Sequence, residues 1–308
     1  MDVVTLGESM VVFLPEAEGP LRHVARFGRG VAGAESNVAI GLCRLGHPTA
    51  WIGRVGEDEF GRYILDTLAT EGLDLRFASA DPGAPTGIMF KERRPGADSR
   101  VVYYRAGSAA SRLDAGDVPE AVFAGAAWLH VTGITAALGD GPRRAVARAL
   151  ELAARFGLRV SFDPNYRARL WSEEQARPVL RDLASQCDLL LLGTAEGRLL
   201  YGSDDPEEIA RAGLRAGPTL VAVKRGSEGA LLAGNEGRWA IPPHPVSIVE
   251  PTGAGDAFAA GCIAALLDGQ PPLACGRLGA LCGALVCTVA GDWEGAPDRE
   301  TAASLLGR

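Results

Sequence analysis

The sequence predicts an α/β fold with a mostly parallel central sheet flanked by helices. First, short apolar segments alternate along the chain with longer helical segments, a pattern typical of parallel strands joined by helices. Second, two segments, residues 10–31 and about 85–106, show strand-like alternation with no long helix, which indicates a small separate sheet. We therefore expect a single domain over residues 1–308, with the small sheet inserted as a lid.

The expected strands are short and rich in Val, Leu and Ile, as in sheets buried on both faces. They lie at residues 3–6, 50–53, 128–132, 158–162, 188–192 and 219–224. Helical periodicity between them predicts helices at residues 35–45, 58–71, 141–156, 172–185 and 206–216. Two uncharged stretches, residues 257–267 and 278–291, are shorter than the roughly 18 residues of a membrane span, so buried helices are expected there.

Composition excludes several classes of protein. The chain is 47% hydrophobic and 22% charged, an ordinary globular profile, and its net charge of -7 argues against a nucleic-acid partner. Its six cysteines form no Cys-x-x-Cys pair and no zinc-like spacing with His, so we expect reduced core thiols in a cytoplasmic protein. Asp2 precedes the first apolar segment, so neither a signal peptide nor a membrane partner is predicted.

The residues just before the stretch 257–267 have the composition of an anion-binding turn. Gly253, Ala254 and Gly255 are small, so their backbone N–H groups can face a ligand at the start of a helix. Asp256 can accept a hydroxyl proton beside this turn, which suits phosphoryl transfer to an alcohol. The alternative is an ordinary helix start capped by Asp. The helix dipole is expected to lower the pKa of Asp256, which is tolerable where positioning dominates the reaction.

Two further glycine-containing segments carry weaker signals. Residues 30–39 form a Gly-x-x-Gly entry to a helix without the dinucleotide fingerprint Gly-x-Gly-x-x-Gly. Asn37 in that helix is either a solvated polar residue or a hydrogen-bonding partner for a polyol. Residues 221–230 place two basic residues and a glycine turn after a strand, without a Walker A loop. Both a solvent-exposed hairpin and the border of a nucleotide site fit this pattern.

In combination, residues 33–37, 52–61 and 251–256 resemble the two signature regions of the ribokinase-type (PfkB) carbohydrate kinases, and the resemblance covers essentially the whole chain. Residues 102–109, 163–171 and 291–297 are most similar to the members that phosphorylate the sugar acid 2-keto-3-deoxygluconate. The resemblance implies a ribokinase-like three-layer fold with a small β-sheet lid, and ATP-dependent phosphorylation of the 6-hydroxyl. It also implies ATP and Mg²⁺ as cofactors, a monovalent cation as a further candidate, and a homo-oligomer, either a dimer through the lid or a larger assembly.

The same resemblance assigns roles to individual residues. Asp256 is the expected catalytic base, and the N–H groups of Gly253, Ala254 and Gly255 are expected to stabilise the transferring phosphoryl group. The expected substrate-binding residues are Gly33, Ala34, Asn37, Met89, Tyr103, Arg105, Arg167, Asp256 and Asp292. Of these, Arg105 and Arg167 are expected to pair with a substrate carboxylate, with surface salt bridges as the alternative.

For the nucleotide, the resemblance implies contacts from Asn165, Arg167, Gly193, Lys224, Arg225, Gly226, Ser227, Gly229, Gly253, Gly255 and Ala280. Glu196 is expected to act on Mg²⁺ through water. The chain departs from the family pattern at Gly193 and Ala280, where relatives often carry polar residues, and at Met89, where sugar-acid kinases tend to have Tyr. Glu250 also replaces the more usual Asp.

Two alternative functions stay open at this point. Met89 favours a fructokinase or ribokinase acting on a neutral sugar, whereas Arg105 and Arg167 favour a sugar acid. A sugar-responsive binding protein without catalysis is the other alternative, and the acids at Asp256 and Glu196 argue against it.

Overall fold

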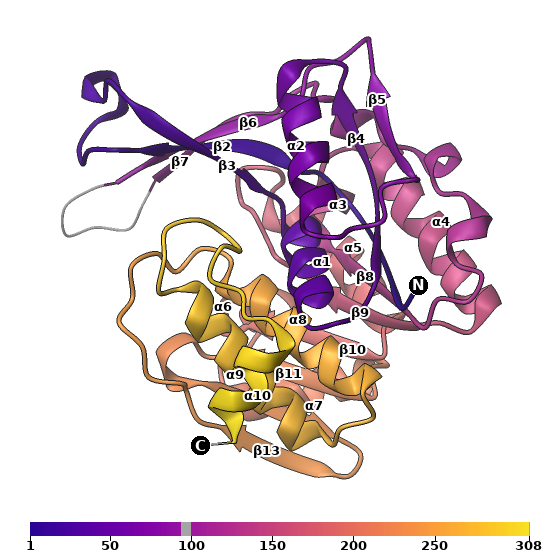
Figure 1. The fold of residues 1–308 in the computed structure, drawn as a ribbon. Helices are drawn as coiled ribbons and strands as arrows, with labels where there is room; N and C mark the ends of the chain where they lie inside the picture. Colours follow the sequence, from indigo (N-terminus) through magenta and orange to yellow (C-terminus); the bar gives the residue numbers. More distant parts are fainter. Residues whose placement is uncertain (94–99, 308) are drawn as a thin grey trace.

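A nine-stranded sheet with the order β13-β12-β11-β10-β9-β8-β1-β4-β5 crosses the main body of the computed structural model, which describes residues 1–93 and 100–307 (Figure 1). The expected strands are present as β1 (Val3–Leu6), β4 (Thr49–Gly56), β8 (Trp128–Thr132), β9 (Arg159–Asp163), β10 (Leu189–Gly193) and β11 (Leu220–Lys224). All of them are parallel to their neighbours among these strands. The α/β prediction is therefore confirmed.

Three strands at the two ends of the sheet were not predicted: β5 (Ala78–Asp81) at one edge, and β12 (Ala230–Gly234) and β13 (Gly237–Ile241) at the other. β12 and β13 pair antiparallel with their neighbours, and only β5 continues the parallel pattern. They are joined by short turns or lack an apolar run, so the alternation of strands with helices does not reveal them.

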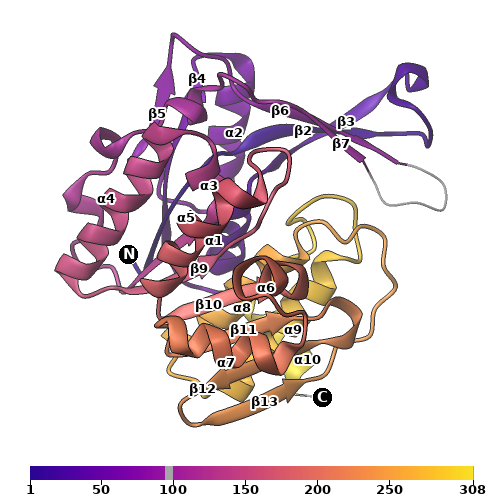
Figure 2. The same ribbon diagram turned by 180° about the vertical axis from the view of Figure 1, so that it is seen from behind.

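Helices cover both faces of the sheet. One face carries α1 (Ala34–Arg44), α2 (Glu59–Thr70), α8 (Ala254–Leu267), α9 (Pro272–Val286) and α10 (Arg299–Leu306), which lie in front in Figure 1. The other carries α3 (Gly133–Ala137), α4 (Asp140–Phe156), α5 (Glu173–Ser185), α6 (Thr194–Tyr201) and α7 (Pro206–Ala216) (Figure 2). Leu189 and Leu191 pack against the first layer and Leu190 and Leu192 against the second, as the alternation of side chains along a strand requires.

One helix differs from its expected position. The stretch 278–291 was expected to be a buried helix, but α9 begins at Pro272 and ends at Val286. Proline suits the first helical turn, so Pro272 starts the helix early. The residues that follow it instead form a loop in which Gly291 has φ +122°. Of the helices in the described chain, none is long and apolar enough to cross a membrane.

The lid is a second sheet with the order β3-β2-β6-β7, built from β2 (Met10–Pro15), β3 (Phe27–Ala32), β6 (Ile88–Glu92) and β7 (Arg100–Tyr104). It projects from the main body in both ribbon views (Figures 1 and 2). Residues 94–99 of the expected lid segment 85–106 lie outside the described residues. The inner face of the lid carries a cluster of Met10, Val12, Ala32 and Met89 with Val101 and Tyr103.

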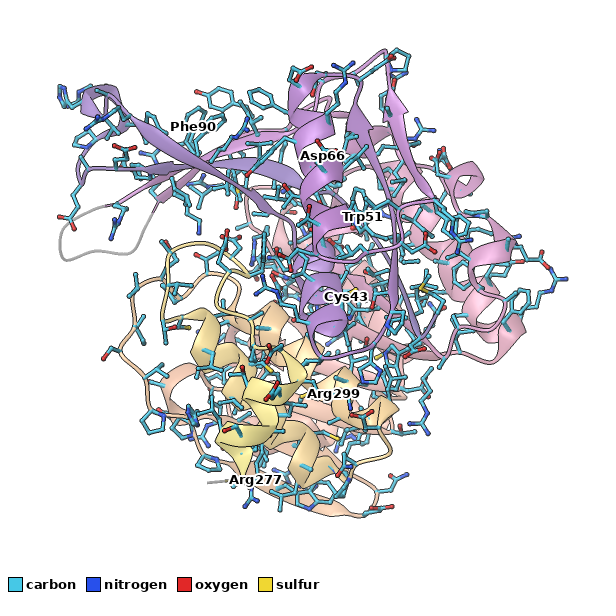
Figure 3. All side chains as sticks on the ribbon, viewed as in Figure 1. Cys43, Trp51, Asp66, Phe90, Arg277 and Arg299 are labelled. Atoms are coloured by element: carbon cyan, nitrogen blue, oxygen red, sulfur yellow. The ribbon has the colours of Figure 1, made fainter. Side chains whose placement is uncertain are left out.

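The outer face of the lid is aromatic. The Phe13 and Phe90 rings stack at 4.7 Å, and Phe27 and Tyr104 meet Phe90 edge-on at 5.5 and 6.0 Å. Figure 3 shows Phe90 out on the lid, whereas Trp51 lies within the main body. The Tyr104 residue is 63% exposed, so this face presents apolar rings to solvent in the single chain.

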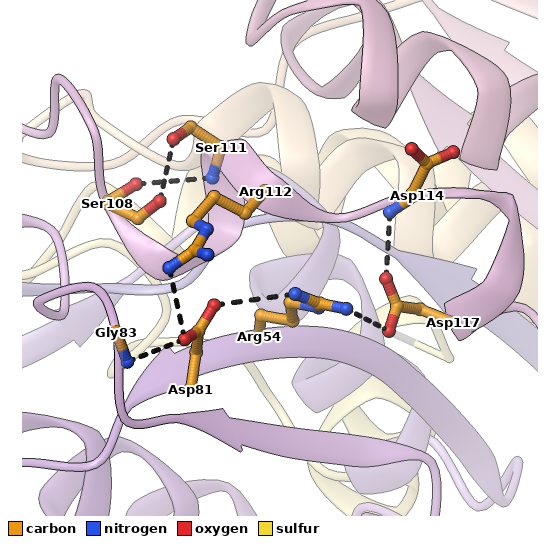
Figure 4. A network of polar contacts seen from close by, with 8 residues as sticks. All are labelled: Arg54, Asp81, Gly83, Ser108, Ser111, Arg112, Asp114 and Asp117. Atoms are coloured by element: carbon orange, nitrogen blue, oxygen red, sulfur yellow. Dashed lines mark hydrogen bonds and ion pairs between the residues drawn. The ribbon is translucent and has the colours of Figure 1, made fainter.

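An ionic network joins residues of the main body on either side of the lid hairpin β6–β7 (Figure 4). Arg54 of β4 pairs with Asp117 at 2.7 Å and with Asp81 at 3.4 Å. Asp81 also accepts from Arg112 at 3.2 Å, and its side chain caps the Gly83 amide at 2.8 Å. Asp81 ends β5 of the main sheet before the chain enters β6, and Arg112 follows β7, so the network joins the two body segments that flank this lid hairpin.

Candidate active site

Polar and glycine-rich segments meet beyond the carboxyl ends of the parallel strands. β1 lies between β4 and β8, and the strand order runs outward from it in both directions. A crevice for ligands forms at such a point in open parallel sheets. The helices α1 and α8 both begin at this edge, and contacts from Asn37 of α1 reach α8.

The turn before α8 has the open backbone expected of an anion site. Gly253 has φ +84°, and a Cβ there would lie 1.8 Å from the Asp292 carbonyl oxygen, so only glycine fits. The Ala254 amide makes a long bond of 3.4 Å to the Pro251 carbonyl. Gly255 and Asp256 follow in the first turn of α8, where the helix dipole favours an anion.

The Asp256 carboxylate accepts hydrogen bonds from two asparagines. The Asn37 amide donates at 2.8 Å and the Asn165 amide at 3.4 Å. Asn165 has a positive φ of 41°, a conformation Asn tolerates better than most residues. Burial, helped by the Asp163 charge and opposed by the Asn37 bond, raises the pKa of Asp256 to about 7. The prediction that the helix dipole lowers this pKa is wrong in direction, because burial outweighs it.

A second charged group lies beside Asp256. Lys224 donates to Asp163 at 2.5 Å, and a Cβ on Gly255 would lie 3.3 Å from the Lys224 ammonium. Burial disfavours the lysine charge, but Asp163 and Glu196 outweigh it and raise the pKa of Lys224. Lys224 is thus a charged ammonium next to the turn, placed to stabilise negative charge there.

Glu196 lies in the first turn of α6 and faces the same region. Its two oxygens accept from the Gly193 amide at 2.7 Å and the Tyr166 amide at 2.9 Å. Burial and the Asp163 charge raise the pKa of Glu196. Within the described chain, no group of three or more His, Cys, Asp or Glu forms a preformed metal site. The action of Glu196 on Mg²⁺ through water therefore stays a prediction.

A cavity of about 480 Å³ lies under the inner face of the lid, and we call it the lid cavity. It is lined by every residue expected to bind substrate, namely Gly33, Ala34, Asn37, Met89, Tyr103, Arg105, Arg167, Asp256 and Asp292. Gly253 and Gly255 also line it, so the anion turn forms part of its wall. The structure therefore brings these residues together, although they are spread over residues 33–292.

The two arginines expected to bind a carboxylate differ in their partners. Arg105 pairs through Nη2 with the buried Glu8, whose other oxygen accepts from Ser108 at 2.6 Å. Arg167 makes only a bond of 3.3 Å to the neighbouring Tyr166 carbonyl among the contacts of the described chain. Glu8 thus orients Arg105 and offsets its charge, whereas Arg167 has no ion-pair partner within 4 Å among the described residues.

A second cavity of about 570 Å³ adjoins the first, and we call it the hairpin cavity because the turn between β11 and β12 borders it. Of the residues expected to bind nucleotide, it is lined by Lys224, Gly226, Ser227, Gly229, Gly255 and Ala280. Val246, Ile248 and Phe258 add apolar surface. Lys224, Pro251 and Gly255 line both cavities. The anion turn therefore lies where the two cavities meet.

Comparison with known proteins agrees with this geometry. Residues 1–299 match the pfkB family carbohydrate kinase. The chain belongs to the PfkB family of carbohydrate kinases. Two relatives named 2-dehydro-3-deoxygluconokinase, from Bacillus subtilis (strain 168) and Thermoproteus tenax, are 40% and 39% identical to this PfkB kinase. The matches cover 99% of the chain, and 95% and 94% of the relatives. A Klebsiella pneumoniae fructokinase is 37% identical over 96% of both chains.

Solved structures share the fold. An E. coli structure of the ribokinase II type, in complex with ATP and Mg²⁺, superposes with a TM-score of 0.93 and 28% identity, covering 100% of this chain and 99% of the other. The ribokinase-like prediction for the fold is therefore confirmed for this PfkB kinase.

The remaining residues expected to bind the nucleotide do not line the hairpin cavity. Asn165, Arg167, Gly193 and Gly253 line the lid cavity instead, on the side of Asp256. In the described chain Arg225 lines neither cavity and pairs with Glu228 at 2.5 Å. Sequence reasoning missed Glu8 and Lys91, both of which line the lid cavity of this PfkB kinase. A signal for Glu8 was its place directly after Gly7 at the end of the first strand.

Proposed function

We propose that this PfkB kinase transfers the γ-phosphoryl group of ATP to the 6-hydroxyl of 2-keto-3-deoxygluconate, also named 2-dehydro-3-deoxygluconate. Two relatives at 40% and 39% identity carry that activity in their names, and the fructokinase relative is slightly more distant. The observation that carries the proposal is the lid cavity, where Arg105 and Arg167 face the same space as Asp256 and the anion turn. A carboxylate on the sugar matches a guanidinium better than a hydroxyl does.

In the proposed reaction the sugar lies in the lid cavity and ATP lies in the hairpin cavity. The oxygen of the sugar 6-hydroxyl forms a bond to the γ-phosphorus of ATP, and Asp256 accepts the hydroxyl proton. The bond between the γ-phosphorus and the β–γ bridging oxygen breaks, and this oxygen leaves with ADP. The amides at Gly253 to Gly255 and the Lys224 ammonium stabilise the charge on the phosphoryl oxygens. Bound Mg²⁺ would neutralise phosphate charge, and Glu196 would hold it through water.

A kinase for a neutral sugar is the second candidate. Met89 is buried in the lid cavity and offers no strong hydrogen bond, so one polar contact to a sugar acid is missing there. The two candidates differ in what Arg105 contributes. Rates with 2-keto-3-deoxygluconate, fructose and ribose, measured by coupled ADP release, decide between them. No ADP release with any sugar, despite sugar binding by calorimetry, would indicate a binding protein instead.

The sharpest test of the carboxylate contact is Arg105→Ala. Loss of a charge-assisted hydrogen bond is worth about 1.5–3 kcal/mol, so KM for the sugar acid should rise about 10- to 100-fold while KM for ATP changes little. Because this variant leaves Glu8 buried without its partner, the double variant Glu8→Gln with Arg105→Met serves as the matched check on folding. An unchanged KM for the sugar acid in both variants refutes the carboxylate role of Arg105.

We also propose a homo-oligomer assembled through the lid, in the cytoplasm. The exposed aromatic face around Phe90 and Tyr104 supports the assembly, since an apolar face of this kind gains by burial against a second copy. The cysteines support a reducing compartment, because all six are free thiols and five are buried. A monovalent cation stays a prediction, to be tested by comparing activity in potassium and choline salts.

A further inference from the structure

The chain has only two lysines, Lys91 and Lys224, beside 29 arginines. Both lysines line the lid cavity, and each pairs with a buried aspartate. Lysine carries a compact ammonium group, whereas arginine carries a broad planar fork, so the two are not interchangeable in a confined space. A chain that uses arginine at every other basic position has a lysine at these two, where a small cation is enclosed. Lys224 already has a place in the proposed reaction, whereas Lys91 has none.

Lys91 projects from the inner face of lid strand β6 and is 1% exposed. Its ammonium lies 2.6 Å from Asp292 Oδ1 and 3.7 Å from Glu250 Oε2. Both acids lie far from Lys91 in the sequence, Asp292 by 201 positions, and both belong to the main body. Lys91 is therefore the ionic link by which this strand of the lid contacts both of them.

The two acids in turn shape the anion turn. Glu250 accepts from the Thr252 hydroxyl at 2.6 Å, just before Gly253. The Asp292 carbonyl oxygen packs directly on Gly253, at the place where a Cβ would lie 1.8 Å away. Contacts from Lys91 thus reach both sides of the turn that precedes α8.

We propose that Lys91 is a positioning residue whose ammonium couples docking of the lid to the geometry of the anion turn at Gly253 to Gly255. The inference rests on the proposed kinase function and adds to it a residue that acts through Glu250 and Asp292. Two buried carboxylates without a cation repel each other and cost free energy. The turn therefore reaches its catalytic shape when β6 brings the Lys91 charge between them.

The first test replaces Lys91 with Met, which keeps the length of the side chain and removes its charge. Because a displacement of about 1 Å in a reacting group can cost roughly 10²-fold in rate, we expect kcat to fall between about 10- and 100-fold. KM for ATP should stay within about twofold, since no lid residue lines the hairpin cavity in the described chain. The control is Arg26→Met, which removes one charge from an exposed lid ion pair with Glu16 and should leave kcat unchanged.

The second test separates this role from a merely structural one. In Lys91→Ala the missing atoms correspond to propylammonium, so added propylammonium should restore part of kcat, while propanol of the same shape should not. A kcat of Lys91→Met within about twofold of wild type overturns the proposal, and so does a loss that propylammonium fails to rescue.

The two proposals fail in different ways. A wild-type protein that releases no ADP with any sugar refutes the kinase function and not the role of Lys91. In that case calorimetry with 2-keto-3-deoxygluconate provides the measurement. Because Lys91 docks the lid over the sugar, Lys91→Ala should bind the sugar more weakly than wild type, and propylammonium should restore that binding. Equal binding with and without propylammonium overturns the coupling.

Discussion

At the scale of single residues, the environment of Asp256 decides its chemistry. A helix start usually stabilises a carboxylate, but here burial raises the pKa to about 7. A base with such a pKa is half ionised near neutrality and accepts a proton more readily than an ordinary aspartate. The bonds from Asn37 and Asn165 hold the carboxylate in place and partly offset the cost of burying it.

This pKa predicts two opposite pH dependences. Activity should fall as pH drops through about 7, because the base becomes protonated. Stability should change the other way: between about pH 4 and 7 the folded protein binds a proton at Asp256 that the unfolded chain does not, so the free energy of unfolding rises as pH falls through this window.

Asp256→Asn tests both. Turnover should drop by about 10²- to 10⁴-fold with ATP binding retained. Its melting temperature should exceed that of wild type more at about pH 8 than at about pH 5, because the buried charge is gone. Exposed Asp66→Asn is the control, and Figure 3 shows Asp66 on α2. Near-normal turnover of Asp256→Asn would refute the assignment of the base.

At the scale of elements, the described lid residues contribute to the lid cavity and not to the hairpin cavity, whereas the anion turn borders both cavities. β6 and β7 supply Met89, Tyr103 and Arg105 to the lid cavity, whereas the hairpin cavity takes its walls from the described residues 224–287. A change at the base of the lid should therefore act on the sugar and spare the nucleotide. Arg54 is the residue that joins this base to β4 (Figure 4).

Arg54→Leu should raise KM for the sugar by up to about tenfold, since partly exposed ion pairs are worth about 1 kcal/mol. KM for ATP should not change. Steady-state kinetics with each substrate varied in turn provide the measurement. Arg76→Leu is the matched control, because this substitution removes an Arg–Asp ion pair that lies away from the lid. Equal effects on both KM values would show that Arg54 supports the whole fold and not the lid.

At the scale of the whole molecule, the projecting lid leaves one aromatic face without a cover. The exposed ring of Tyr104, beside the half-buried Phe90, costs free energy in a lone chain. If two lids pack face to face, Tyr104→Asp should place a charge in the interface and shift the assembly to monomers, as measured by light scattering after gel filtration. Phe156→Asp, at an exposed ring on α4, should leave the mass unchanged. A wild-type monomer contradicts the lid interface.

Much of the fold could be predicted because its signals are local. Alternation of apolar strands with helices specifies a parallel sheet, and glycines before Asp256 specify an open turn, wherever the rest of the chain lies. The helix start at Pro272 and the outer strands β5, β12 and β13 were missed, since short elements carry weak periodicity. Resemblance to a family then assigned substrate residues that the lid cavity brings together.

Tertiary structure decided the rest, for a physical reason. The sequence and the family resemblance predicted most of the polar residues that line the lid cavity, but they missed Glu8 and Lys91. Pairings between distant charges depend on which strands and loops become neighbours. Glu8 neutralises part of Arg105, and Lys91 meets Asp292 from 201 positions away along the chain. The raised pKa of Asp256 likewise follows from burial, which no local sequence pattern reveals. The sequence thus determined which polar and charged side chains are available to the site, whereas tertiary packing determined their ionisation and their partners.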